Sequence, residues 1–334
     1  MSYNNSFNSS DGFFDFGEID NRSPVRFWLL LVFNTPSIVC ASCVIIHIII
    51  NRTQRRALYN HCILLILIFN LPIQLIDINL QIIYFHYGSV KPPLPSVCLI
   101  WWYIDYTCYL GSMILMAWLA VERHILIFHD GWICNRRRCF ILHYTPMIII
   151  AAYILLFYLA QIFFLPCQNT FDYTLPICGE SPCFESYAFP SKWESIVNGI
   201  LPITLETFAS ISFLIRVQLQ KRRLGRSPQW RKTRRLTMQL SLMSALNIGL
   251  NLPSCLISFA HFCGLPSQYG AQIQTYFSFF AYFITFLFPF VSLCQLPELR
   301  KAIKKKIFFL APQHQRQISR VAPTLMKRQM PTVQ

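Results

Sequence analysis

Seven apolar stretches of 24 to 28 residues alternate with short polar segments along the chain. They cover residues 27–50, 59–86, 97–123, 141–165, 194–217, 236–261 and 271–295. A helix needs roughly 20 apolar residues to cross a bilayer, so each stretch is long enough. Because backbone groups inside a membrane must find partners within the protein, we predict an all-α membrane protein, a bundle of seven transmembrane helices.

Composition and charge support this prediction. The 334 residues are 54% hydrophobic and 13% charged, whereas soluble domains are about 25% charged. The net charge of +15 could suggest a nucleic-acid partner, but 25 of the 29 Lys and Arg residues lie in alternate connecting segments. The positive-inside rule puts these segments in the cytoplasm and the N-terminus outside. We therefore expect a multi-pass plasma-membrane protein whose basic segments lie near anionic lipid, with no nucleic-acid partner.

The chain divides into three parts on the same pattern. We expect residues 1–26 to form an extracellular tail, 27–310 the seven-helix domain, and 311–334 a short cytoplasmic tail. The first part is rich in Ser and Asn and has no signal-peptide pattern. Its sequons at Asn4 and Asn8 are predicted glycosylation sites, since they lie outside and away from the membrane.

The third apolar stretch carries an unusual row of polar residues. Asp105 is the only formal charge between Val97 and Val121. Arg123 follows Asp105 by 18 residues, or five helical turns, so both lie on one face of a helix. Charged groups on a transmembrane helix face other helices or a water-filled cavity. This helix therefore lies against the interior of the bundle.

Cys98 begins this stretch and Glu122-Arg123-His124 ends it. With these two features the stretch resembles the third helix of rhodopsin-like G-protein-coupled receptors. That helix has a loop-bonded Cys at its extracellular end and an Asp/Glu-Arg-Tyr triplet at its cytoplasmic end. His124 departs from the usual aromatic residue. The resemblance implies a receptor for an extracellular ligand. It also implies that Glu122 holds Arg123 at rest and releases it to a heterotrimeric G protein.

Other landmarks of that family have counterparts here. They are Asn70 in the second stretch, Leu250-Asn251-Leu252-Pro253 in the sixth, Phe288-Pro289-Phe290-Val291-Ser292 in the seventh and Pro297–Lys301 after it. Asn70 replaces an Asp, and Asn251 replaces the Trp that precedes the sixth-helix proline. The chain thus resembles a divergent member, of the orphan-type invertebrate group. The resemblance implies switch roles for Asn70, Pro253 and Pro289, and a short amphipathic eighth helix.

Five cysteines are assigned to the oxidising outer side: Cys98, Cys167, Cys178 and Cys183, and Cys263, which is left over as a free thiol or rim residue. Cys183 precedes the fifth-helix proline by 19 residues, about where related receptors place the Cys bonded to the third helix. The resemblance therefore favours Cys98–Cys183 with Cys167–Cys178. The alternative is Cys98–Cys178, because spacing alone does not determine connectivity.

The resemblance also implies a ligand site. Asp105 lies about two turns below Cys98, where receptors for cationic ligands hold their amine-binding Asp, and Tyr282 matches the Tyr that hydrogen-bonds it. The other candidate ligand contacts are Trp102, Tyr106, Tyr109, Glu194 and Asn198. Aromatic faces attract cations, so an amine or a peptide with a basic group fits. An opsin would carry a Lys in residues 271–295, and there is none, so no retinal or other cofactor is expected.

Other readings remain open. Asp105 could instead help to hold the bundle together, Asp77 could line the ligand pocket, and Glu206 could join two helices. A transporter or channel is the alternative function, but no pair of similar halves is visible. An enzyme is not expected, because the histidines are scattered singly and no catalytic cluster is apparent.

Overall fold

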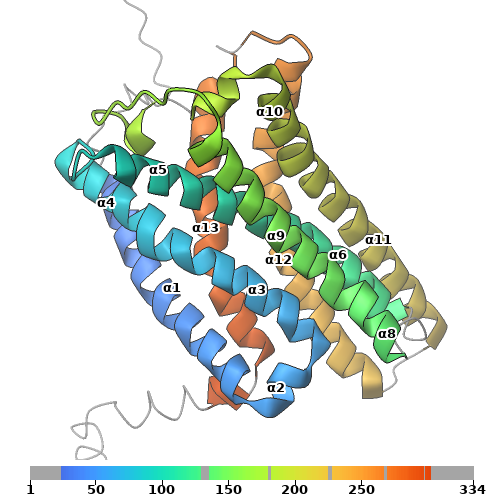
Figure 1. Cartoon of the computed structure of the whole chain (residues 1–334). Coiled ribbons are helices and arrows are strands. Elements are labelled where there is room, and N and C mark those ends of the chain that lie inside the picture. The colour runs from blue at the N-terminus through green and yellow to red at the C-terminus, as the bar shows by residue number, and fades with distance from the viewer. Residues whose placement is uncertain are drawn as a thin grey trace, which may run out of the picture.

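The computed structural model describes residues 24–128, 135–179, 182–224, 228–266, 269–296 and 298–301. Within these ranges the chain forms helices and no strand, and seven helical spans are long and apolar enough to cross a membrane (Figure 1). The spans are Pro24–Ile50, Leu58–Tyr87, Pro95–Phe128, Arg137–Phe164, Ala188–Leu219, Ser241–His261 and Ile273–Gln295. Each coincides with one apolar stretch of the sequence, so the predicted seven-helix bundle is confirmed.

Three spans are continuous helices: α1 (Pro24–Ile50), α12 (Pro228–Phe262) and α13 (Ala271–Gln295). The other four are α-helices joined to π-helical turns. The second span consists of α3 (Leu58–Pro72), η1 (Ile73–Asp77) and α4 (Ile78–Tyr87), and the third of α5 (Pro95–Ile104), η2 (Asp105–Leu110) and α6 (Gly111–Phe128). The fourth span consists of α8 (Arg136–Cys139), η3 (Phe140–Tyr144), α9 (Thr145–Leu159) and η4 (Ala160–Phe164). The fifth consists of α10 (Ala188–Trp193), η7 (Glu194–Ile200) and α11 (Leu201–Leu224). A short helix, α2 (Arg52–Arg56), joins the first two spans.

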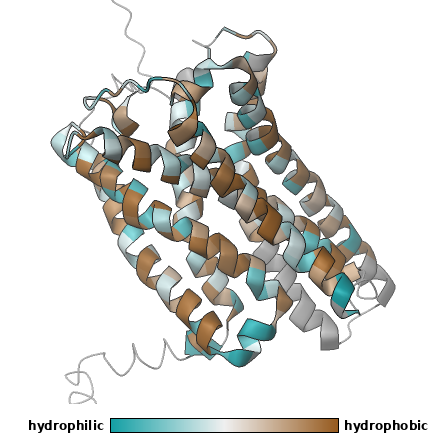
Figure 2. Ribbon diagram, in the orientation of Figure 1, coloured by the Kyte–Doolittle hydropathy of each residue, from teal (hydrophilic) through white to brown (hydrophobic). Residues whose placement is uncertain are grey.

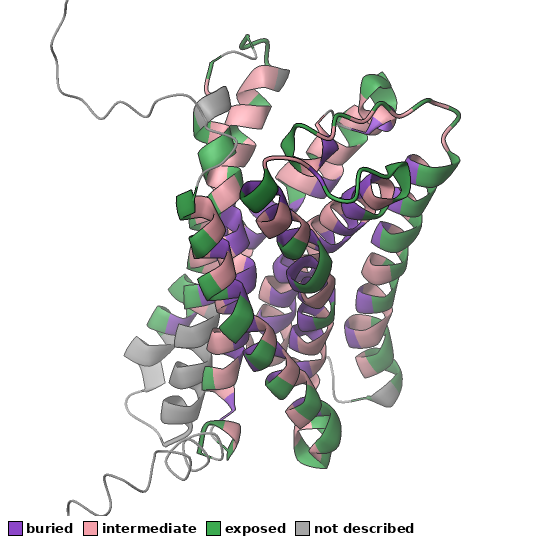
Figure 3. Ribbon diagram, turned by 90° about the vertical axis from the view of Figure 1, so that its left-hand side faces the viewer, coloured by how far each residue is buried: buried purple, intermediate pink, exposed green. Residues whose placement is uncertain are grey.

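Apolar side chains cover the outside of the bundle as well as its core (Figures 2 and 3). Ile50 and Phe164 are each 75% exposed and Phe208 is 72% exposed. In water such a surface would be an aggregation hazard, but against lipid tails it is the favourable arrangement. The polar side chains that a membrane excludes lie inside, which makes this chain a multi-pass membrane protein.

Pro289 shows how the interior satisfies a broken helix. Proline has no N–H, so the carbonyl of Thr285, four residues earlier, loses its helical donor. The buried Gln74 side chain donates to that carbonyl at 3.0 Å and to Ser37 Oγ at 2.9 Å. Ser37 in turn donates to the carbonyl of Phe286 at 2.9 Å. These contacts tie α13 to the first two spans.

Some predictions concern residues that the structure does not describe. The tail of residues 1–23 with Asn4 and Asn8, and the tail of residues 311–334, lie outside the described ranges. Of the predicted eighth helix, residues 298–301 are helical and the rest lies outside as well. Glu298 accepts a hydrogen bond from Asn51 at 3.2 Å, which joins this helix to the end of α1.

Candidate functional site

A cavity of about 430 Å³ opens at the outer end of the bundle. Pockets for small ligands are typically about 300–1,000 Å³. Asp105, Tyr109 and Tyr282 line it, as the sequence predicted, and Arg26 and Gln81 line it too. The cavity thus places one carboxylate and one guanidinium around a space of ligand size.

Asp105 opens the π-helical turn η2, and its side chain is partly exposed. Among the described residues, none donates a hydrogen bond to its carboxylate or forms an ion pair with it. The predicted bond from Tyr282 is wrong: the Tyr282 hydroxyl accepts from Gln81 instead. Asp105 is therefore an acid that faces the cavity without a partner among the described residues.

Asp77 is the acid that other side chains hydrogen-bond. It is fully buried, in η1, and does not line the cavity. Its Oδ1 accepts from Trp101 Nε1 at 2.7 Å and from Gln81 at 3.4 Å, whereas its Oδ2 has no hydrogen-bond partner among the described residues. The two acids therefore differ in their surroundings, because two described donors reach Asp77 and none reaches Asp105. The hypothesis that Asp77 lines the pocket is wrong.

The remaining predicted ligand contacts form a second cluster. Tyr106 donates to Glu185, and Asn198 accepts from Tyr153 at 2.8 Å. The Tyr158 hydroxyl accepts from Asn198 at 3.1 Å, and Glu194 lies near this tyrosine. None of these side chains lines the cavity around Asp105. Tyr106 instead joins the third span to the outer loop, and Asn198 joins the fifth span to the fourth.

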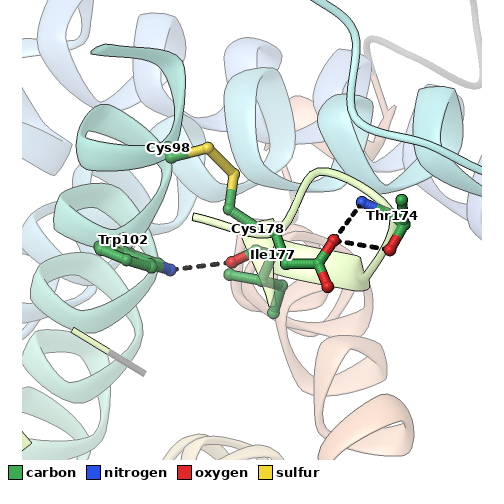
Figure 4. The surroundings of a disulfide bond; sticks show 6 residues. Cys98, Trp102, Thr174, Ile177 and Cys178 are labelled. Atoms are coloured by element: carbon green, nitrogen blue, oxygen red, sulfur yellow. Dashed lines mark hydrogen bonds between the residues drawn. A yellow bond between two sulfur atoms is a disulfide. The ribbon is translucent and has the colours of Figure 1, made fainter. Parts of the chain in front are cut away.

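Two disulfides fix the outer loop over the cavity. They are Cys98–Cys178, drawn in Figure 4, and Cys167–Cys183. The favoured Cys98–Cys183 pairing is wrong and the alternative is right. Trp102 Nε1 also donates to the carbonyl of Ile177 at 2.9 Å, so this residue holds the loop rather than presenting a free ring. These contacts place Ile177 against the cavity.

Ile177 adopts a left-handed conformation with φ 54°, and Gly179 follows with φ 87°. A β-branched residue in this region is strained, typically by about 1–3 kcal/mol, and persists only where its neighbours enforce it. The Asp172 carboxylate steadies the loop by accepting two bonds from Thr174, at 2.8 and 2.6 Å. These bonds hold the pKa of Asp172 below its usual value, so this turn remains intact at neutral pH.

A chain of hydrogen bonds leads from the cavity towards the centre of the bundle. Tyr109 donates to Asn251, Asn251 donates to Asn247 at 2.7 Å, and Asn247 donates to Glu206. Asn247, Asn251 and Glu206 are all buried. Asn251, two residues before Pro253, is thus the middle member of this chain. Glu206 joins α11 to α12, as the sequence suggested.

At the inner end, the partner predicted for Arg123 is wrong. Glu122 accepts a hydrogen bond from His143 Nδ1 and forms no ion pair with Arg123, although all three residues are buried. Arg123 instead donates to the carbonyl of Tyr59 at 2.7 Å, and its guanidinium lies 5.4 Å from that ring. Arg123 also lines a cavity of about 30 Å³ with Ser210 and Ser244. That space is too small for a protein partner.

His61 and His143, which are far apart in the sequence, lie side by side at this end of the bundle. His143 Nε2 lies 2.9 Å from His61 Nδ1, and His61 Nε2 lies 2.8 Å from the carbonyl of Arg55. That carbonyl can only accept, so His61 donates to it through Nε2. Glu122 thus has a partner that does not involve Arg123.

Two further residues with predicted switch roles have defined contacts. Asn70 accepts from Ser112 at 2.8 Å. The His124 ring packs 5.1 Å from Phe128 and 6.4 Å from Phe213. His124 therefore stacks on aromatic side chains at the inner end of the third and fifth spans.

Four residues of the site were not predicted: Arg26, Gln81, His143 and Asn247. Their signal in the sequence is weak, because each is one polar residue in or beside an apolar stretch. Only Asn247 shows a usable pattern, since it precedes Asn251 by one helical turn. The others can be recognised only once neighbouring helices are in place.

Comparison with protein-family models finds no match, and comparison with curated proteins finds none. Among solved structures, the crystal structure of squid rhodopsin is similar, with a TM-score of 0.62. The similarity covers 92% of each chain at 15% sequence identity. The chain is therefore a multi-pass membrane protein with the seven-helix fold of squid rhodopsin, and the rhodopsin-like fold predicted from Cys98 and Arg123 is confirmed.

Proposed function

We propose that this protein is a receptor of the plasma membrane that binds an extracellular cationic ligand and activates a heterotrimeric G protein. The observation that carries the proposal is Asp105, a carboxylate that faces a cavity under a disulfide-anchored loop and has no partner among the described residues. An ionisable residue at this depth is costly, by about 2.5–3.5 kcal/mol on insertion scales. An ammonium or guanidinium group of an amine or peptide would offset that cost.

The signal passes through the hydrogen-bond chain below the cavity. A ligand that shifts Tyr109 changes its bond to Asn251, and Asn247 and Glu206 follow because each bond fixes the next. These residues lie on α12 and α11, the two helices whose inner ends border the small cavity at Arg123. Separation of these ends would open that cavity to a G protein.

The ligand acts by population shift. To change the active fraction from 1:99 to 99:1, it must bind the active form about 10⁴-fold more tightly. A bond between Asp105 and a cation supplies such a difference only if the active form shortens or desolvates it. Tyr109 lines the cavity, so a change in its bond to Asn251 between the resting and active forms would also change its contact with the ligand.

Squid rhodopsin is a likeness of fold, and light detection does not follow from it. A retinal Schiff base needs a Lys in the seventh span, and residues 271–295 contain none. The likeness to squid rhodopsin thus supports the seven-helix architecture, while Asp105 supports a diffusible ligand.

A screen of amines and short basic peptides tests this function. The receptor is expressed in cells, and nucleotide exchange on co-expressed G proteins is measured. Active compounds should lose their effect on the variant Arg123→Ala while still binding, because Arg123 acts on the G-protein side. Compounds that bind without any G-protein response in the wild-type receptor would contradict the proposal.

A further inference from the structure

We infer that the ligand is a zwitterion, with a cationic group for Asp105 and a carboxylate for Arg26. This inference rests on the proposed function, since it takes Asp105 as the counter-ion of the ligand. It narrows the class from amines in general to amino-acid-like molecules and short peptides with a free C-terminus.

Arg26 is placed as a ligand group would require. It lies in the first turn of α1, and its guanidinium carbon is 5.9 Å from the Phe85 ring centroid and 5.4 Å from that of Phe279. Both rings line the same cavity. Stacking between two aromatic faces holds a guanidinium without using its N–H groups, so these five donors remain for an acceptor.

No described carboxylate lies within ion-pair distance of Arg26. The cavity therefore holds two opposite charges, Arg26 and Asp105, and neither has a partner among the described residues. A ligand with one positive charge would pair with Asp105 and leave the guanidinium partly desolvated. Leaving a buried polar group unpaired is costly, so the site favours a molecule that satisfies both groups.

The geometry of Arg26 favours a carboxylate in particular. A guanidinium presents two parallel N–H groups that match the two oxygens of a carboxylate. The cavity of about 430 Å³ accommodates a small molecule or a short peptide end, and Tyr109 and Tyr282 line it together with the two charges.

The chain's own N-terminal acids are the competing partner for Arg26. Asp11, Asp15, Glu18 and Asp20 precede it in the sequence. A carboxylate from this segment and a carboxylate from a ligand have the same chemistry, so the test includes a variant in which all four acids are amides.

Binding is measured with purified full-length receptor in lipid nanodiscs, by the rise in unfolding temperature that a ligand causes. The probes are free dipeptides and ω-amino acids of increasing length, each with its C-amidated and N-acetylated form. We expect amidation to weaken binding by roughly 30-fold or more, as for a buried charge pair that loses one partner. Arg26→Gln should abolish the preference for acid over amide, and Arg26→Lys should retain part of it.

Lys91→Gln is the matched control. Lys91 is an outer cation 4.1 Å from the Tyr87 ring centroid and does not line the cavity, so its variant should keep the full preference. Equal binding of acid and amide to the wild-type receptor would overturn the inference and leave the proposed function intact. Binding that ignores N-acetylation and Asp105→Asn would overturn the proposed function.

Two further results would overturn the inference. In one, the preference for the acid appears only in the variant whose four N-terminal acids are amides. This result would mean that these acids occupy Arg26 in the wild-type receptor. In the other, no zwitterion of the series binds although simple amines do.

Discussion

The contact between Glu122 and His143 predicts the effect of one substitution on signalling without ligand. His143→Phe keeps a ring of similar size and removes the hydrogen-bond partner that the buried Glu122 carboxylate has among the described residues. The adjacent Arg123 is the buried cation that can replace it. We therefore expect Glu122 to turn to Arg123 in this variant, and to form the pair that the wild-type structure lacks.

The magnitude follows from two opposing terms. An ion pair at 4 Å is worth about 4 kcal/mol at an effective dielectric constant of 20. Arg123 would give up its bond to the Tyr59 carbonyl, which is worth about 1.5–3 kcal/mol for a charged donor. The resting form gains about 1–2.5 kcal/mol, so ligand-independent signalling should fall by about 5- to 70-fold.

The assay is nucleotide exchange on a co-expressed G protein, normalised to receptor at the cell surface. Adding Glu122→Gln to His143→Phe should restore the signal, because the neutral amide no longer attracts Arg123. His61→Phe is the matched control and should change little, since it leaves the bond between His143 and Glu122 in place. Unchanged signalling in His143→Phe at wild-type surface level, or a fall that persists in the double variant, would refute this reasoning.

Three more predictions concern the outer loop, sodium and the central hydrogen-bond chain. Cys178→Ala should lower surface expression more than Cys183→Ala, because the first disulfide closes a separation of 80 residues and the second one of 16. Closing these loops stabilises the fold by about 4.5 and 3 kcal/mol, respectively, in the chain-entropy model, and equal surface labelling of the two variants would argue against this. Agonist affinity should not respond to sodium at matched ionic strength, because Asn70 provides no anionic oxygen for a hard cation, and a sodium-specific loss of affinity would show that such a site exists. Asn247→Leu should reduce the maximal G-protein response at wild-type ligand affinity, since it cuts the link between Asn251 and Glu206, whereas a full response would show that the signal takes another route.

The sequence predicts the architecture well for a simple reason. The length of an apolar stretch is a local property, and a membrane allows such a stretch to be only a helix. The row from Cys98 through Asp105 to Arg123 depends on the period of one helix, so it too could be recognised from the sequence.

The contacts between helices could not be predicted in the same way. Asp77 ends one π-helical turn and Asp105 begins another, and a π turn alters which way the residues beyond it face. The Tyr282 hydroxyl therefore pairs with Gln81, which also donates to Asp77, and not with Asp105. The pairing of Cys98 was equally open, because Cys178 and Cys183 are only five residues apart.

The replacement of the predicted Glu122–Arg123 pair by Glu122–His143 has a similar cause. His143 is 21 residues from Glu122, on another span. Its approach depends on the packing of the third span against the fourth. No pattern within either stretch specifies that packing.

The central claim is that Asp105 is the counter-ion of a cationic ligand, and Asp105→Asn tests it most directly. This change keeps the shape of the side chain and removes its charge. With an agonist from the screen, the dose–response curve should shift by roughly 30-fold to several thousand-fold at wild-type surface level, because a buried charge pair loses about 2–5 kcal/mol when one partner is removed. Asp172→Asn, an acid of the outer loop away from the cavity, is the matched control and should respond normally. Normal potency of Asp105→Asn at wild-type surface level would contradict the account.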